Sequence, residues 1–283
     1  MVHPGLGWLE ASPEGRDWLR ALPELRAECE RAWGVSSAGA PFAYAYASLA
    51  YPVVADGTPA VLKLQFPDRE SEHEADALEA WDGDGAVRLL ARDDERRALL
   101  LERLLPGTAL TGHDDALDVV LGLLVRLWVP APSPVHALAE EAAWWAATLE
   151  DAWEAAGRPW ERALLDAARD YLELLPPTQG EQVLLHQDLH PDNVLAAERE
   201  PWLVIDPKPL RGEREFAAAP IVRAHDLGHD RRSVLARLDR VCSELGLDGE
   251  RARGWTIAQT LAWGTGDDAQ YQAEVARWLL EAA

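Results

Sequence analysis

The sequence has very little lysine, cysteine or methionine, and it has no long apolar run. Its 283 residues include two cysteines, one methionine and only two lysines. The sequence contains no apolar stretch of 18 residues, so we expect no membrane span. It does not open with basic residues followed by an apolar run, so we expect no secretory signal. Cys29 and Cys242 lie far apart without neighbouring histidine or cysteine, which argues against a zinc site or a disulfide framework. We expect two reduced, buried thiols in a cytoplasmic protein.

Positive charge is also scarce. There are 27 lysine and arginine residues against 49 acidic residues, and the formal net charge is −22. A phosphate backbone would be repelled, so nucleic acid is not an expected partner. A cationic small-molecule substrate would be attracted, although solubility explains the same charge. The sequence leaves open whether the chain is a monomer or a dimer.

Arginine supplies nearly all of the positive charge. Because 25 of the 27 basic residues are arginine, Lys63 and Lys208 are exceptions. Lysine carries a compact point charge on a flexible stem, whereas arginine carries a broad planar fork. The two lysines therefore indicate positions where a guanidinium group will not serve.

The first third of the chain predicts a small antiparallel sheet. Period-two alternation and an Asp-Gly turn at residues 56–57 are typical of strands and hairpins. Strands are expected at residues 42–46, 50–54, 60–64, 87–91 and 98–104, with helices at 3–34 and 68–82. Pro106-Gly107-Thr108 breaks the pattern. We therefore place a lobe boundary there, with residues 1–105 as the N-terminal lobe and 106–283 as the C-terminal lobe.

The remainder is mainly helical. Apolar residues at helical spacing predict helices at residues 115–128, 137–156, 160–175, 230–246 and 250–283. The predicted fold class is α+β, with a sheet lobe followed by a helical lobe into which a hairpin is inserted.

That hairpin, residues 183–208, is the most informative segment. It predicts a strand, a polar loop, a strand, a turn and a strand that ends at an acid. Such a hairpin can bring Asp188, Asn193 and Asp206 together, and two carboxylates with a carboxamide are suited to Mg²⁺ and a phosphoryl group. His-x-Asp-Leu-x-x-x-Asn, followed by a strand and Asp, is the pattern of a kinase catalytic loop and metal-binding acid.

Lys63 fits the same interpretation. It lies in an apolar strand after the Asp-Gly turn, where kinases carry their phosphate-binding lysine. Glu74, at the border of the apolar face of the next helix, is the acid that we expect to reach Lys63. The backbone of residues 101–104 would follow the cleft, where it could bond an adenine edge.

Together these segments resemble the aminoglycoside phosphotransferases, small-molecule kinases of the protein-kinase-like fold. More narrowly, the chain resembles the branch with streptomycin 6-phosphotransferases and hydroxyurea phosphotransferases. The residues that carry the resemblance are 58–63, 73–75, 100–104, 186–195 and 205–208. It implies a bilobal fold and transfer of the ATP γ-phosphoryl group, with Mg²⁺, to a hydroxyl of an aminoglycoside or related aminosugar.

The resemblance also implies residue roles. Asp188 would accept the hydrogen bond and proton of the attacking hydroxyl, while Asn193 and Asp206 would hold Mg²⁺. Lys63, kept in place by Glu74, would bind phosphates. Further candidates are Ser48, Glu102 and Leu104 for the nucleotide, and His190, Lys208, His225, Asp226 and Asp230 for the acceptor; His186 would support the loop. We expect the acceptor wall to come from residues 222–232 and 255–263.

Three positions depart from the family pattern. Gln187 stands where glycine is common, the phosphate turn at residues 44–48 has no glycine, and Phe216 is followed by alanines rather than by Asp. Three other functions are therefore considered: a sugar or metabolite kinase of the same fold, a nucleotide-binding pseudokinase-like module, or a metallohydrolase. The last would use His186, Asp188, His190 and Asp192. The sequence does not separate ATP from GTP.

Overall fold

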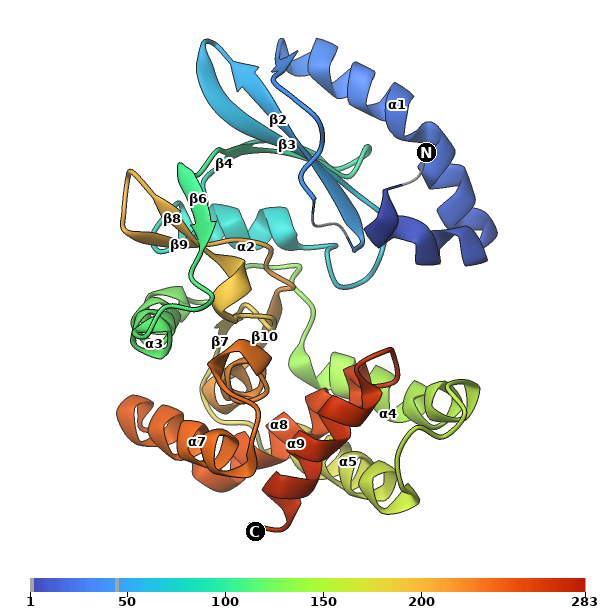
Figure 1. Ribbon diagram of the computed structural model, residues 1–283, viewed down its shortest axis with the longest axis vertical. Helices are drawn as coiled ribbons and strands as arrows, with labels where there is room; N and C mark the ends of the chain where they lie inside the picture. The colour runs from blue at the N-terminus through green and yellow to red at the C-terminus, as the bar shows by residue number, and fades with distance from the viewer. Residues whose placement is uncertain (1–2, 44–45, 283) are drawn as a thin grey trace.

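The computed structural model describes residues 3–43 and 46–282, and it places a sheet-containing part above a mainly helical part (Figure 1). The upper part holds a five-stranded antiparallel sheet in the order β1-β2-β3-β5-β4. Its strands are β1 (Ser36–Ser37), β2 (Ser48–Ala55), β3 (Thr58–Gln65), β4 (Leu89–Asp93) and β5 (Ala98–Glu102).

The β2–β3 hairpin positions Lys63. Asp56 and Gly57 form its turn with φ values of 47° and 80°, which confirms the predicted Asp-Gly turn. Lys63 pairs with Ala50 in the middle of the hairpin. Helix α1 (Pro13–Trp33) begins after Ser12, whose side chain caps it, and is followed by Gly34; it lies along this sheet (Figure 1).

Two predictions for this part were wrong. No strand covers 42–46: Tyr44 and Ala45 lie outside the described residues, and Phe42 and Tyr46 are not in a strand. The helix expected at 68–82 begins only at Glu74, as α2 (Glu74–Trp81). The Asp68 side chain accepts a hydrogen bond from the Ser71 amide (2.7 Å), which favours a turn over a helix there.

Two smaller sheets lie between the upper sheet and the lower helices. One has the order β6-β8-β9, from β6 (Pro106–Ala109), β8 (Val194–Ala197) and β9 (Trp202–Val204). The other pairs β7 (Gln182–Leu185) with β10 (Leu210–Glu213). The expected pairing within 183–208 was therefore only half right, because the polar loop after β7 carries the chain into a different sheet. Strands β6 and β10 were not predicted.

Helices make up the lower part (Figure 1). They are α3 (Ala116–Leu127), α4 (Leu138–Ala155), α5 (Arg162–Leu174), α6 (Ala218–Val222), α7 (Arg231–Leu245), α8 (Gly249–Trp263) and α9 (Ala269–Leu280). The predicted helices from 115 to 246 agree to within two residues, whereas 250–283 forms two helices. Short 3-10 helices add Pro4–Ala11, Pro176–Thr178, Pro191–Asn193, Arg214–Ala217 and His225–Leu227.

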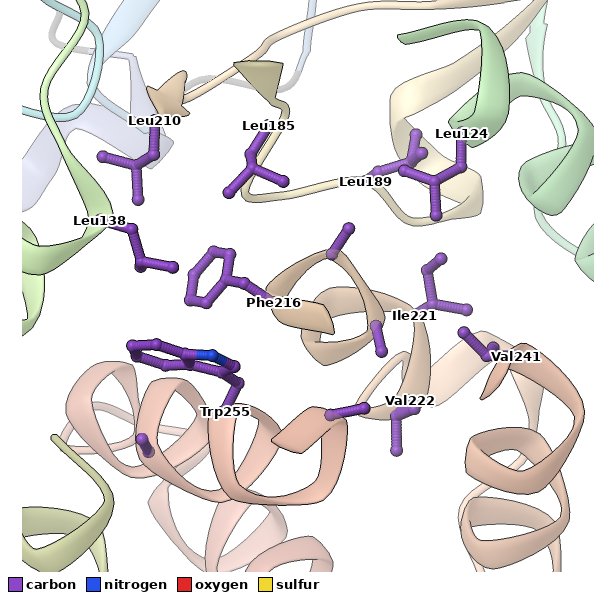
Figure 2. Packing of buried hydrophobic residues seen from close by; sticks show 14 of the residues in the cluster. Leu124, Leu138, Leu185, Leu189, Leu210, Phe216, Ile221, Val222, Val241 and Trp255 are labelled. Atoms are coloured by element: carbon purple, nitrogen blue, oxygen red, sulfur yellow. The ribbon is translucent and has the colours of Figure 1, made fainter. Parts of the chain in front are cut away.

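An aromatic core fills the space between these helices and the two-stranded sheet of β7 and β10. Phe216 is fully buried, 6.2 Å from the ring of Trp145 and 5.5 Å from that of Trp255. Leu185 and Leu189 point toward the same core from above (Figure 2). Each buried leucine contributes roughly 1.5–3 kcal/mol. The polar residues 186–188 are therefore held between two apolar anchors.

Two expectations from composition concern the whole chain. Cys29 and Cys242 are free and buried, as predicted. Across residues 3–43 and 46–282, no helix combines the length and apolar character needed to cross a bilayer.

Candidate active site

A buried lysine links the two parts of the molecule. The Lys63 Nζ lies 2.6 and 2.8 Å from the carboxylate oxygens of Glu74, and 2.8 Å from Asp206 Oδ1. Burial disfavours the ammonium ion, but the charges of Asp206 and Glu74 outweigh it and raise the pKa of Lys63. The predicted Lys63–Glu74 contact is therefore present, and Asp206, two residues after β9, joins it.

Glu74 is held as firmly as the lysine. Its side chain is almost completely buried, and Gln65 Nε2 donates to its Oε2 at 2.7 Å. Burial raises the pKa of Glu74 to about 7, with Lys63 opposing that shift. Glu74 is thus fixed from two sides, and α2 sets the position of the lysine.

Asp188, in the polar loop after β7, lies between two cations. Lys208 Nζ is 3.1 Å from Asp188 Oδ2, and Arg223 Nη2 is 3.1 Å from Oδ1. Burial favours the neutral acid, but these two cations outweigh it and hold the pKa of Asp188 far below its usual range. Asp188 is therefore a fixed carboxylate at neutral pH.

The His186 side chain supports this loop through hydrogen bonds to main-chain groups. Its Nε2 lies 2.9 Å from the Ile205 carbonyl, and its Nδ1 accepts from the Asp188 amide at 3.3 Å. Both ring nitrogens are thus engaged, which excludes His186 as the metal ligand of a metallohydrolase. Burial lowers the pKa of His186 to about 4, so the ring is neutral at physiological pH.

This burial predicts an acid-sensitive fold. Between about pH 6.5 and pH 4 the unfolded chain binds the His186 proton and the folded chain does not, so stability falls as the pH falls. His186→Gln removes this titration, and its amide can still donate to the Ile205 carbonyl. From pH 7 to pH 4.5, wild type should lose roughly 2 kcal/mol more unfolding free energy than the variant.

Urea unfolding at the two pH values measures this difference. The raised pKa of Glu74 acts in the opposite direction, but it is common to both proteins and cancels in the comparison. Equal pH dependence of the two proteins would contradict a neutral, buried His186.

Gln187 adopts the conformation that glycine usually supplies. Its φ is +66°, in the left-handed region, where a side chain costs roughly 1–2 kcal/mol. Its carbonyl accepts from Gln259 Nε2 at 2.9 Å, which ties the loop to α8. The loop thus keeps its shape despite the departure from the family pattern.

Asn193 and Asp206 fit a hard divalent cation. Asn193 Nδ2 donates to the Asp188 carbonyl (2.8 Å), so its carboxamide oxygen remains as a donor for a metal. The Ile205 amide bonds the Asn193 carbonyl at 3.0 Å, which brings Asp206 beside Asn193. The Asp206 side chain is half exposed. An open carboxylate with a carboxamide oxygen is the donor set that Mg²⁺ accepts.

The three residues predicted to bind the nucleotide, Ser48, Glu102 and Leu104, lie in different surroundings. Ser48 pairs with Gln65 at the start of β2, two positions from the Lys63 pair. Glu102, at the end of β5, is engaged by Arg199 at 2.6 Å, and Leu104 lies in the buried link to β6. Their contact with a nucleotide stays a prediction.

The candidate acceptor residues form two groups. His190 Nε2 is 3.9 Å from Asp188 Oδ1, and Lys208 bonds Asp188, so both belong to the site. His225 and Asp226 follow Arg223 on the next turn of chain. Asp230 instead caps α7 by accepting from the Ser233 amide at 3.0 Å, so its role in acceptor binding stays a prediction.

Sequence reasoning did not single out two residues of the site. Arg223 pairs with Asp188 across 35 positions of sequence, and the Trp263 ring lies under both cations, 4.6 Å from Lys208 Nζ and 4.8 Å from the Arg223 guanidinium carbon. No local spacing pattern marks Arg223. Its only signal is its position within the expected acceptor wall, residues 222–232.

Comparison with known proteins supports the resemblance. Residues 32–269 match the family model described as aminoglycoside/hydroxyurea antibiotic resistance kinase. A streptomycin 6-kinase of Streptomyces griseus is 42% identical over 258 residues, which cover 88% of this chain and 83% of the relative. A hydroxyurea phosphotransferase of Kitasatospora aureofaciens is 44% identical, over 87% of this chain and 73% of the relative.

Solved structures share the fold at low sequence identity. A thermostable mutant of an aminoglycoside phosphotransferase, in complex with ADP and hygromycin B, aligns over 91% of this chain and 98% of its own (TM-score 0.63, 16% identity). A choline kinase of Streptococcus pneumoniae aligns over the same shares (TM-score 0.62, 13% identity). The predicted protein-kinase-like fold is confirmed. The chain belongs to the aminoglycoside/hydroxyurea antibiotic resistance kinase family, and it is a phosphotransferase that acts on a hydroxyl of a small molecule.

Proposed function

We propose that this protein transfers the γ-phosphoryl group of ATP, with Mg²⁺, to a hydroxyl of a streptomycin-like aminoglycoside. Two sets of ion pairs carry the proposal. Lys63 pairs with both Glu74 and Asp206. The carboxylate of Asp188 is held between Lys208 and Arg223. Phosphoryl transfer needs mainly positioning and charge neutralisation, and these groups supply both.

Asp188 acts on the acceptor. Each of its carboxylate oxygens bonds one cation and keeps a lone pair for the acceptor hydroxyl. Because its pKa is far below the usual range, Asp188 is a weak base that orients the hydroxyl. As the acceptor oxygen bonds to the γ-phosphorus and the bond to the ADP oxygen breaks, the hydroxyl becomes acidic and its proton passes to Asp188.

Lys63 acts on the nucleotide. Its ammonium ion, fixed by Glu74, would face the α- and β-phosphates between the lobes 1–105 and 106–283. Asn193 and Asp206 would hold Mg²⁺, which neutralises phosphate charge when bound. The Glu74 contact keeps the lysine directed into this space and limits its motion.

A cationic acceptor fits the acidic mouth of the site. Thr111 Oγ1 bonds Asp192 and lies 3.4 Å from Asp226 Oδ2, so two carboxylates meet beside the catalytic loop. Amino groups of an aminoglycoside would be attracted there, and the net charge of −22 acts in the same direction. The streptomycin 6-kinase relatives, 41–42% identical, favour this acceptor.

A panel of acceptors tests the proposal. ADP release from MgATP should be fastest with streptomycin, whereas choline and neutral sugars should give at least about tenfold lower kcat/KM, since one lost charge contact is worth about 1.4 kcal/mol or more. Hydroxyurea is included because of the relative named for it. The same panel with GTP separates the two nucleotides.

The outcomes discriminate between the alternatives. If turnover is highest with a neutral sugar, the proposed aminoglycoside acceptor is wrong and the protein is a sugar or metabolite kinase of the same fold. ATP binding without Mg²⁺ dependence, and without turnover of any acceptor, would favour a pseudokinase-like module.

A further inference from the structure

A second polar cluster lies at the start of α2 and shares no residue with the site around Asp188. Within residues 3–43 and 46–282, the donor atoms of Glu72, His73 and His136 all lie within 4.8 Å of one another. His73 is the residue before α2, and His136 lies between α3 and α4. The cluster therefore joins the sheet part of the molecule to the helical part.

The arrangement of donors is that of a zinc site. Two imidazoles and a carboxylate, with further positions open, form a known ligand set for Zn²⁺. A tetrahedral ion with bonds of about 2.1 Å holds its donors roughly 3.4 Å apart. Glu72 is exposed and His136 is half-buried, so small side-chain rotations can close the remaining distance. The rings of His73 and His136 already lie 4.6 Å apart.

The surroundings prepare His73 as a ligand. Its Nδ1 is 2.9 Å from Asp76 Oδ2, and a carboxylate can only accept, so the hydrogen is on Nδ1. The Nε2 lone pair is then free, in the carboxylate–histidine–metal arrangement typical of zinc sites. On the other side, the Arg211 amide donates to the His136 carbonyl at 2.8 Å and fixes that backbone.

The hydrogen bonds of the cluster do not use all of its possible ligand atoms. His136 Nε2 is 3.0 Å from Glu72 Oε2, which accounts for one carboxylate oxygen and one ring. His73 is 7% exposed, its ring lies edge-on to that of His136, and its Nδ1 bonds Asp76. A cavity of about 450 Å³, lined in part by Glu72 and His73, gives an ion and its water access to the cluster.

We propose that Glu72, His73 and His136 bind one Zn²⁺ ion or a similar transition-metal ion. The ion would fasten the start of α2 to the segment before α4. Because Glu74 directly follows His73, the ion would also hold the acid that positions Lys63. The site is separate from the proposed Mg²⁺ ligands and does not depend on the identity of the acceptor.

Metal titration of the whole chain tests the proposal. Calorimetry with Zn²⁺ should show one site, and Co²⁺ should give the visible absorption of a tetrahedral complex that Zn²⁺ then displaces. Zn²⁺ should also raise the melting temperature, since a ligand that binds only the folded chain stabilises it. His73→Gln and His136→Gln should each weaken binding by more than about tenfold, as loss of even a supporting contact has that effect.

His113→Gln is the matched control, because it removes a histidine outside the cluster. His113 packs its ring at 5.0 Å from Trp202 and should leave Zn²⁺ binding unchanged. Glu72→Gln keeps both imidazoles and should still weaken binding, which guards against a misfolded histidine variant. Absence of binding to wild type, or equal binding by wild type and both cluster-histidine variants, would overturn the proposal.

Discussion

Replacing Asp188 with asparagine should lower kcat by about 10³-fold, the usual contribution of a positioned proton acceptor. The carboxamide has nearly the same shape, but its single oxygen can accept from only one of the two cations, Lys208 or Arg223, which bond different oxygens of Asp188. It cannot take the proton of the acceptor hydroxyl, and it presents an NH₂ group where that hydroxyl must donate. Steady-state assays with MgATP and streptomycin measure the loss, and calorimetry should show that ATP still binds.

The control is Asp151→Asn, which changes an exposed aspartate on α4 and should leave kcat unaltered. The Asp188 variant must also melt as a folded protein. Retention of activity within about tenfold of wild type would remove Asp188 from the proposed chemistry.

Replacing Lys63 with methionine should lower kcat/KM for ATP by about 10²–10³-fold, as loss of a single buried charge-stabilising donor does in other enzymes. Methionine fills a similar volume but brings no charge to the phosphates. Glu74 has a pKa already raised to about 7, so it can become protonated and the pocket need not hold an unpaired charge. Initial rates at varied ATP concentration, together with urea unfolding, separate lost function from lost stability.

Two further variants sharpen this test. Lys63→Arg keeps the charge but introduces the planar fork that this sequence uses elsewhere, and it should also lose most of the activity. Glu74→Gln leaves Lys63 paired with Asp206 and should show a smaller loss. Full activity of Lys63→Arg would show that the scarcity of lysine has no functional meaning at this position.

Local sequence patterns predicted that Lys63 would contact Glu74 and that Asp188, Asn193 and Asp206 would come from one segment. The Asp-Gly turn fixes the hairpin that carries Lys63, and α2 follows closely enough for Glu74 to be proposed as its partner. His186 to Asn193 is a continuous loop, so the positions of Asp188 and Asn193 relative to each other are nearly set by the chain itself. Asp206 follows the short hairpin of β8 and β9, which comes directly after this loop.

Contacts between distant segments could not be predicted in the same way. Arg223 meets Asp188 only because the segment after α6 packs under the loop, and Trp263 comes from the end of α8. Strand β7 pairs with β10 rather than with β8, so its partner lies beyond the predicted hairpin. His136 likewise meets His73 across 63 positions of sequence.

The most direct test of the central claim is mass spectrometry of streptomycin after incubation with this protein and MgATP. The proposed site predicts a product heavier by one phosphoryl group, formed only when Mg²⁺ and ATP are both present. Under identical conditions the Asp188→Asn protein should form almost none. Unmodified streptomycin with wild type, while ATP binds normally, would contradict the assignment of an aminoglycoside acceptor; equal product from both proteins would contradict the role of Asp188.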